Sequence, residues 1–145
     1  MDHIHQVVKD FEELSARELY EILKLRARVF VVEQECAYQD LDDVDYKSIH
    51  IMLQNEGNIV AYARVYEAEN GLWHMGRVLT IRRGCGLGNQ VVNLAVSVAG
   101  ERGARVIEIE AQCYATGFYK KTGFEECSRE FMLDGIPHVR MKLEL

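Results

Sequence analysis

The sequence predicts a single domain of the mixed α/β class. Segments with strand and helix patterns alternate along the chain, and the composition, with 48% hydrophobic and 28% charged residues, is ordinary for a soluble globular protein. Domains commonly hold about 100–200 residues, so residues 1–145 are expected to form one domain. A chain of this length buries about 70% of the surface that its unfolded form exposes, so it needs neither a disulfide nor a metal to stay folded.

The N-terminal half is expected to hold a strand, a helix and three further strands. Ser15 and Glu18 form an S-x-x-E capping box, which satisfies free backbone donors at a helix start. From Leu19 to Phe30, mostly apolar residues recur at helical spacing. The expected elements are a strand at 4–9, a helix from 16 to about 34, an acidic connector at 40–45, and strands at 50–54, 58–66 and about 72–81.

The C-terminal half continues the alternation of helices and strands. Gly103 can end the first helix of this half in a left-handed conformation, and Asp134-Gly135 is a strong hairpin signal. That helix carries one apolar stripe, formed by Val91, Val92, Ala95, Val98 and Ala99. The expected elements are a helix at about 88–102, a strand at 106–112, a short helix at 115–123, and strands at 124–133 and 138–145.

Charge and cysteine content narrow the classes of partner. The chain holds 17 Lys and Arg against 23 Asp and Glu, a net charge of −6, so neither nucleic acid nor an anionic membrane is expected as a partner. The first residues do not show the pattern of a secretory signal, so none is expected, and no apolar run approaches the roughly 18 residues of a membrane span. The four cysteines form no C-x-x-C pair, so we expect no metal site and a cytoplasmic protein with reduced thiols.

The strongest chemical signal is the glycine-rich segment 83–89, which lies between an expected strand and an expected helix. Its three glycines let backbone N–H groups approach a ligand, and the helix start adds free amides and a positive dipole end, which together suit a pyrophosphate. A Rossmann or P-loop motif beginning at Gly84 would need a glycine where Asn89 stands. What remains is R-x-x-G-x-G from Arg83 to Gly88, or a plain strand-to-helix turn.

This motif resembles the acetyl-CoA loop of the GNAT N-acetyltransferase superfamily. Residues 112–124 resemble the family signature N/Q-x-x-A-x-x-[LF]-Y-x-x-x-G-F, and residues 29–45 with 134–138 resemble the ElaA-like branch. The resemblance implies a GNAT fold, with a central mixed, mostly antiparallel sheet that splays between two parallel strands and is flanked by helices. It also implies direct transfer of an acetyl group from acetyl-CoA to a primary amine of a small molecule or a protein, without a metal.

The resemblance also assigns roles to individual residues. Tyr119 matches the phenol that protonates the leaving thiolate, and Glu33, Tyr38 and His138 are expected on the substrate side. The general base is left open among Glu33, His138, Glu108 and Glu110. The residues expected to bind acetyl-CoA are Val78, Leu79 and Thr80 along the pantetheine arm, Arg83, Gly84, Cys85, Gly86, Leu87, Gly88 and Asn89 at the pyrophosphate, and Gln112, Ala115 and Phe118.

Several alternatives stay open at this point. A GNAT-like module could bind acyl-CoA without turnover, as a sensor or an interaction partner, and a homodimer is one assembly that the sequence allows. The acidic connector at 40–45 is either a solvated link or a group of carboxylates that attracts a cationic amine. The link 79–82 is about two residues shorter than the family usually has, so either the strand ends early or the loop is entered more tightly.

Overall fold

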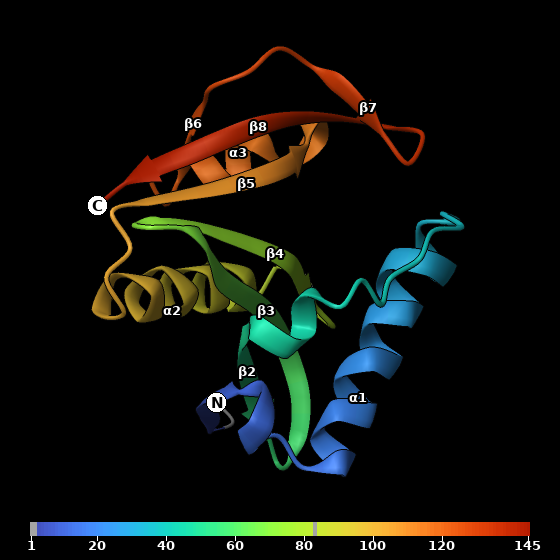
Figure 1. Cartoon of the computed structure of the whole chain (residues 1–145). Helices are drawn as coiled ribbons and strands as arrows, with labels where there is room; N and C mark the ends of the chain where they lie inside the picture. Colours follow the sequence, from blue (N-terminus) through green and yellow to red (C-terminus); the bar gives the residue numbers. More distant parts are fainter. Residues whose placement is uncertain (1–2, 83) are drawn as a thin grey trace.

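The computed structural model, shown in Figure 1, describes residues 3–82 and 84–145. Its described part forms an eight-stranded sheet in the order β1-β2-β3-β4-β5-β8-β6, with β7 paired to β8. The neighbouring strands are antiparallel except for β4 and β5, which run parallel. The strands are β1 (Ile4–Asp10), β2 (Ile49–Asn55), β3 (Asn58–Glu69), β4 (Leu72–Thr80), β5 (Val106–Gln112), β6 (Glu125–Glu126), β7 (Phe131–Leu133) and β8 (Ile136–Glu144).

The first α-helix begins where its capping box predicts. Ser15 Oγ accepts a hydrogen bond from the Glu18 amide at 3.0 Å, and the Glu18 carboxylate accepts one from the Ser15 amide at 2.8 Å. The expected first helix is α-helical only as far as Arg26 and then continues as a π-helix. The helical segments are η1 (Phe11–Glu13), α1 (Ala16–Arg26), η2 (Ala27–Glu33), η3 (Val44–Lys47), α2 (Leu87–Glu101), η4 (Cys113–Ala115) and α3 (Thr116–Lys120).

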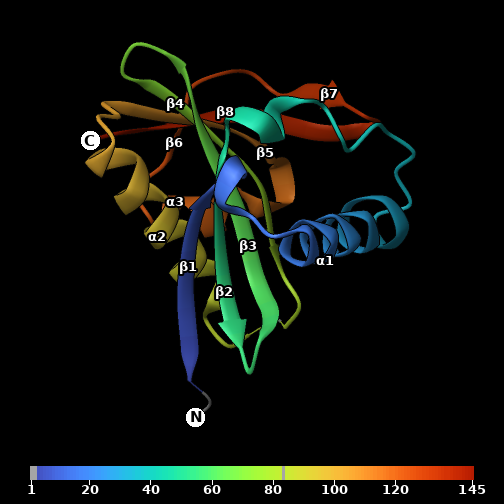
Figure 2. The same cartoon turned by 60° about the horizontal axis from the view of Figure 1, so that its bottom comes forward.

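The helices α1 and α2 cover opposite faces of the sheet, as Figure 2 shows from below. Successive strand residues alternate between the two faces, so on β2 Ile51 packs on the α2 side while Met52 packs against Ile22 of α1. All five apolar stripe positions predicted for α2 are buried. No helix within the described ranges is long and apolar enough to cross a membrane.

The parallel strands β4 and β5 separate soon after they begin. They pair only over Leu72–His74 of β4 and Val106–Glu108 of β5, and the rest of each strand runs apart from the other (Figure 1). On its other edge β4 carries a bulge, since Arg77 and Val78 together oppose the single residue Ala63 of β3. Arg77 has a φ of +53°, a conformation that costs an L-residue roughly 1–2 kcal/mol.

The link from β4 to α2 is short because the loop turns tightly. The strand does not end early, since it reaches Thr80 and the Ile81 amide still donates to the Val60 carbonyl at 3.0 Å. The chain then reverses with positive φ angles at Gly84 and Gly86, which glycine adopts without a steric penalty. Arg83, predicted at the pyrophosphate, lies outside the described residues.

Candidate functional site

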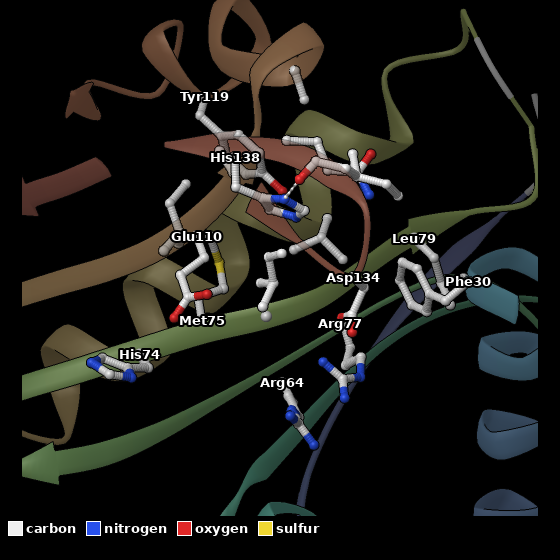
Figure 3. A pocket seen from close by; sticks show the side chains of 18 of the residues that line it. Phe30, Arg64, His74, Met75, Arg77, Leu79, Glu110, Tyr119, Asp134 and His138 are labelled. Atoms are coloured by element: carbon white, nitrogen blue, oxygen red, sulfur yellow. Dashed lines mark hydrogen bonds between the residues drawn. The ribbon is translucent and has the colours of Figure 1, made fainter. Parts of the chain in front are cut away.

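The separated parts of β4 and β5 border a cavity of about 690 Å³. Figure 3 shows labelled side chains such as Tyr119, His138 and Glu110 around it. Within residues 3–82 and 84–145, no group of three or more His, Cys, Asp or Glu side chains could hold a metal ion. The predicted site residues that line the cavity are Tyr38, Val78, Leu79, Thr80, Gly88, Gln112, Ala115, Phe118, Tyr119 and His138.

One wall of the cavity is the unpaired backbone edge of β4. The Ile81 amide points towards β3, because it donates to the Val60 carbonyl. Successive amides of a strand alternate between its two edges, so the N–H groups of Thr80 and Val78 face the open side. The side chain of Leu79 is only 3% exposed and packs with the core on the α1 side. An extended ligand with amide groups can therefore pair with this edge as an added strand would.

The glycine loop offers free backbone donors beside that wall. A side chain at Gly84 or Gly86 would meet nothing within 4 Å, so the backbone of both is open to a ligand. Gly86 is the N-cap of α2, and the first amides of a helix have no partner within it. These amides belong to Leu87, Gly88 and Asn89, and the first turn carries no acidic residue that would repel an anion.

Gly88 has a different role from the other loop glycines. A Cβ placed on Gly88 would lie 3.0 Å from the ring of Phe118. Glycine at this position therefore lets α2 approach α3 closely, which brings the loop next to the Tyr119 helix. Cys85 is exposed and its thiol donates to the Arg82 carbonyl at 3.8 Å, so it contacts the loop itself.

Tyr119 enters the cavity from α3. Its ring packs edge-on against Phe118 and Phe124, with centroid separations of 5.0 and 6.0 Å. In the described part of the chain its hydroxyl has no hydrogen-bond partner. Burial raises the pKa of the Tyr119 phenol to about 12, so the hydroxyl keeps its proton at neutral pH and can donate it to a ligand.

His138 lies on β8, opposite Gln112 of β5. Its Nδ1 is 2.7 Å from the Ile136 carbonyl oxygen, and since a carbonyl only accepts, Nδ1 carries the hydrogen. The ring is 7% exposed and stacks on Phe131 at 6.1 Å. This arrangement fixes the ring and leaves Nε2 as the nitrogen that can accept a proton.

Comparison with known proteins identifies the fold family. The family model for the acetyltransferase (GNAT) domain matches residues 10–145. The chain belongs to the GNAT acetyltransferase family. Its mixed sheet with splayed parallel strands confirms the GNAT fold expected from the sequence, and its relatives confirm the ElaA-like branch.

Three GNAT relatives show how far the similarity extends. A UPF0039 protein of Schizosaccharomyces pombe is 39% identical, with 100% of both chains covered. The crystal structure of Escherichia coli ElaA is 32% identical, with a TM-score of 0.92, and covers 98% of this chain and 100% of that chain. The structure of an acyl-CoA N-acyltransferase from Pseudomonas aeruginosa is 31% identical, with a TM-score of 0.89, and covers 95% of this chain and 98% of that chain.

Glu33, predicted as a base and substrate contact, does not line the GNAT cavity. Its carboxylate faces out and accepts a hydrogen bond from the exposed Arg28 at 3.1 Å. The physical reason is the π-helix that follows Arg26. A widened turn rotates the residues after it around the helix axis, so Gln34 rather than Glu33 lines the cavity.

The other candidate carboxylates, Glu108 and Glu110, do line the cavity, on the strand face that alternation predicts. Glu108 lies where β4 and β5 separate, with its carboxylate 3.8 Å from Nε2 of His74. His74 Nδ1 is in turn 3.1 Å from the Tyr66 hydroxyl. Glu108, His74 and Tyr66 thus form a row of groups in this part of the cavity that can bind or relay a proton.

The acidic connector 40–45 is neither a solvated link nor a set of free carboxylates. Asp45 accepts hydrogen bonds from Arg26 at 2.6 Å and from Arg64 at 3.0 Å, while Asp40 accepts one from Arg26 at 3.0 Å. Asp42 pairs with Arg64 at 2.7 Å. Both expectations for this segment are therefore corrected: three of its carboxylates are neutralised by arginines and cannot attract an amine.

The environment of this ion-pair cluster alters the acidity of its members. Burial alone would raise the pKa of Asp42, but the hydrogen bonds and charge of Arg64 lower it to about 2. The Tyr38 hydroxyl donates to Asp40 at 2.8 Å, and burial, reinforced by this bond, raises the Tyr38 pKa. Tyr38 therefore offers its ring, and not a free hydroxyl, to the cavity.

Sequence reasoning missed the arginines of this cluster. Arg26 is fully buried and Arg64 is 4% exposed. Their signal was present, since each interrupts an apolar pattern, Arg26 in the stripe of the first helix and Arg64 in the strand 58–66. A charge at an otherwise apolar position needs an opposite charge, which the acidic connector supplies.

Proposed function

We propose that this protein transfers an acetyl group from acetyl-CoA directly to a primary amine of a small molecule or a protein. The observation that carries the proposal is the cavity between the separated strands, which has the open amide edge of β4 and the glycine loop at one side and Tyr119 within it. The name of the Pseudomonas aeruginosa relative, an acyl-CoA N-acyltransferase, supports the same kind of donor and a nitrogen acceptor.

The chain's residues fit the parts of acetyl-CoA. The Thr80 amide would pair with the pantetheine arm, and the Val78 amide, further along the same edge, would face the thioester. The open backbone at Gly84 and Gly86, with the free amides of α2, would bind the pyrophosphate. Arg83 would add a positive charge there. Phe118, whose ring leaves too little room for a Cβ on Gly88, would hold the loop beside the cavity.

Tyr119 would act on the leaving group. Acyl transfer leaves negative charge on the sulfur of CoA, and a neutral phenol can stabilise this charge by donating a hydrogen bond to it as the sulfur leaves. The high pKa of Tyr119, about 12, guarantees that the proton is present throughout the neutral range. The amide of Val78 would donate to the thioester oxygen, where charge also develops.

His138 would accept the proton of the amine. An alkyl ammonium has a pKa of about 10 and must lose a proton before it can attack. The Nε2 atom of His138 is free to accept it, directly or through water, because Nδ1 is held by the Ile136 carbonyl. Glu110 lines the same cavity and is the second candidate for this step, whereas Glu33 faces away.

The test is a panel of polyamines, amino acids, aminoglycosides and peptide N-termini, assayed for release of the CoA thiol, together with a thermal scan. Binding at a hundredfold excess over the dissociation constant stabilises the native state by about 2.7 kcal/mol, so acetyl-CoA should raise the melting temperature. No shift at millimolar acetyl-CoA would overturn the proposal. A shift without turnover of any amine would favour the acyl-CoA sensor.

A further inference from the structure

The bulge in β4 places positive φ on an unexpected residue. Arg77 has a φ of +53°, although its neighbour Gly76 could adopt such a conformation freely. Gly76 is not among the glycines with positive φ, and a Cβ there would meet nothing within 4 Å. Strained backbone of this kind persists where the surrounding contacts over-determine it.

The side chain of Arg77 supplies these contacts. Its Nε donates to Asp40 Oδ1 at 2.8 Å, and its Nη2 donates to the Asp40 carbonyl at 3.1 Å and to Asp42 at 3.3 Å. The guanidinium also lies over the Tyr38 ring, 5.4 Å from its centroid. Asp40 is itself held by the buried Arg26, so Arg77 is anchored to a fixed point.

The position of the bulge decides which peptide unit is turned. The ψ angle of residue 77 sets the plane of the peptide between residues 77 and 78, and hence the direction of the Val78 N–H. The pairing of Leu79 with Tyr62 and of Gly76 with Arg64 requires one extra residue between them. If the positive φ moved to Gly76, the turned peptide would be the one that precedes Arg77.

We infer that Arg77 is a positioning residue whose bonds to Asp40 and Asp42 keep the positive φ at residue 77 and so hold the Val78 N–H towards the cavity. The consequence for activity rests on the proposed function, in which this N–H contacts acetyl-CoA. Through Arg77, the aspartates of the acidic connector would help to orient the Val78 N–H that contacts acetyl-CoA. Arg77, Asp42 and Tyr38 all line the cavity (Figure 3 labels Arg77).

Three variants test whether Arg77 acts by fixing the backbone of the bulge. Arg77→Ala removes the bonds to Asp40 and Asp42, while alanine at position 77 still disfavours a positive φ. The positive φ should therefore move to Gly76, and kcat/KM for acetyl-CoA should fall about tenfold. Arg77→Gly also removes the anchor but tolerates positive φ, so its loss should be smaller. Gly76→Ala added to Arg77→Ala removes the unstrained alternative and should recover part of the loss. Arg28→Ala, which deletes an exposed arginine with one ion pair, is the matched control.

Backbone NMR provides a readout that does not depend on activity. The carbon chemical shifts of residues 76 and 77 report which of them has positive φ, and they should exchange roles in Arg77→Ala. Wild-type shifts in that variant, or equal losses in Arg77→Ala and Arg77→Gly without recovery by Gly76→Ala, would overturn the inference. A wild type that binds no acetyl-CoA would refute the proposed function and leave the NMR test of the bulge intact.

Discussion

Replacing Tyr119 with phenylalanine removes one hydroxyl and leaves the ring in place. The edge-on contacts with Phe118 and Phe124 are made by ring atoms, which the variant retains. The hydroxyl has no hydrogen-bond partner in the described part of the chain, so no native bond is lost. We therefore expect the free energy of unfolding to change by less than about 0.5 kcal/mol.

The kinetic effect follows from the acidity of the phenol. General acid catalysis contributes about 10²–10⁴-fold. The pKa of Tyr119 is raised to about 12, above the roughly 8.5 of a thiol, so full proton transfer to a formed thiolate is uphill. The hydroxyl then acts mainly by donating a hydrogen bond to the developing charge, and we expect the lower end of the range, a loss of about 10²-fold or 2.7 kcal/mol.

The assay is CoA thiol release with an amine from the panel, fitted for kcat and for the KM of acetyl-CoA. A loss confined to the transition state lowers kcat and leaves KM nearly unchanged. Tyr20→Phe is the control, since Tyr20 is 67% exposed on α1 and should keep the wild-type rate. Wild-type kcat in Tyr119→Phe would remove the hydroxyl from the mechanism, and a rise in KM alone would make it a binding group.

The remaining predictions concern the loop, the base and the ion-pair cluster. Gly86→Asn tolerates positive φ but covers the free amides, so calorimetry should show about tenfold weaker acetyl-CoA binding, whereas Gly57→Asn, at a similar φ in a distant turn, should bind normally. His138→Gln should lower kcat about 10²-fold with little change in the KM of acetyl-CoA; a wild-type kcat in this variant would favour Glu110 as the base. Arg64 lowers the pKa of Asp42 to about 2, so Asp42→Asn should lower the free energy of unfolding in urea by about 1 kcal/mol above pH 5, after allowance for partial exposure. Because the wild-type carboxylate is protonated as the pH falls from 4 to 2, this difference between variant and wild type should vanish over that range. A difference that persists at pH 2 would contradict the ion pair.

The local elements of the fold could be predicted because their signals are local. The capping box at Ser15 and Glu18 satisfies its donors within one turn, and the stripe of α2 needs only one apolar face. The positions of Val78, Thr80, Phe118 and the other motif residues at the cavity followed from the family resemblance, because the motif fixes their order along two strands and two helices.

The misplacement of Glu33 has a different origin. Apolar residues at spacings of three and four predict a helix, but a pattern this short does not show that the hydrogen bonding changes from α to π after Arg26. The change after Arg26 turns the following residues by about the 100° that one residue occupies in an α-helix. That rotation moves Glu33 outward, while Val29 and Phe30 in the same segment pack against the apolar cluster on the α1 side of the sheet.

The ion pairs of the acidic connector could not be predicted from the residues near it in the sequence. A run of aspartates has the composition of a solvated loop, and nothing near it in sequence reveals that Arg26, Arg64 and Arg77 arrive from three separate elements. The three arginines offset the charges of Asp40, Asp42 and Asp45 one for one.

Because the acidic connector is neutralised by arginines, selectivity for a cationic acceptor is expected to come from other carboxylates of the cavity. Since the connector's ion pairs leave little net charge at the cavity, they cannot draw a cationic amine towards the thioester. Apart from Asp42, the carboxylates that line the cavity are those of Glu108 and Glu110 on β5 and that of Asp134 in the turn between β7 and β8. His74 lies 3.8 Å from Glu108, and Arg140, which also lines the cavity, is the register partner of Glu110 on β8. An acceptor ammonium should therefore be attracted towards the carboxylates of β5 and of the turn before β8, near the point where Gln112 is paired with His138.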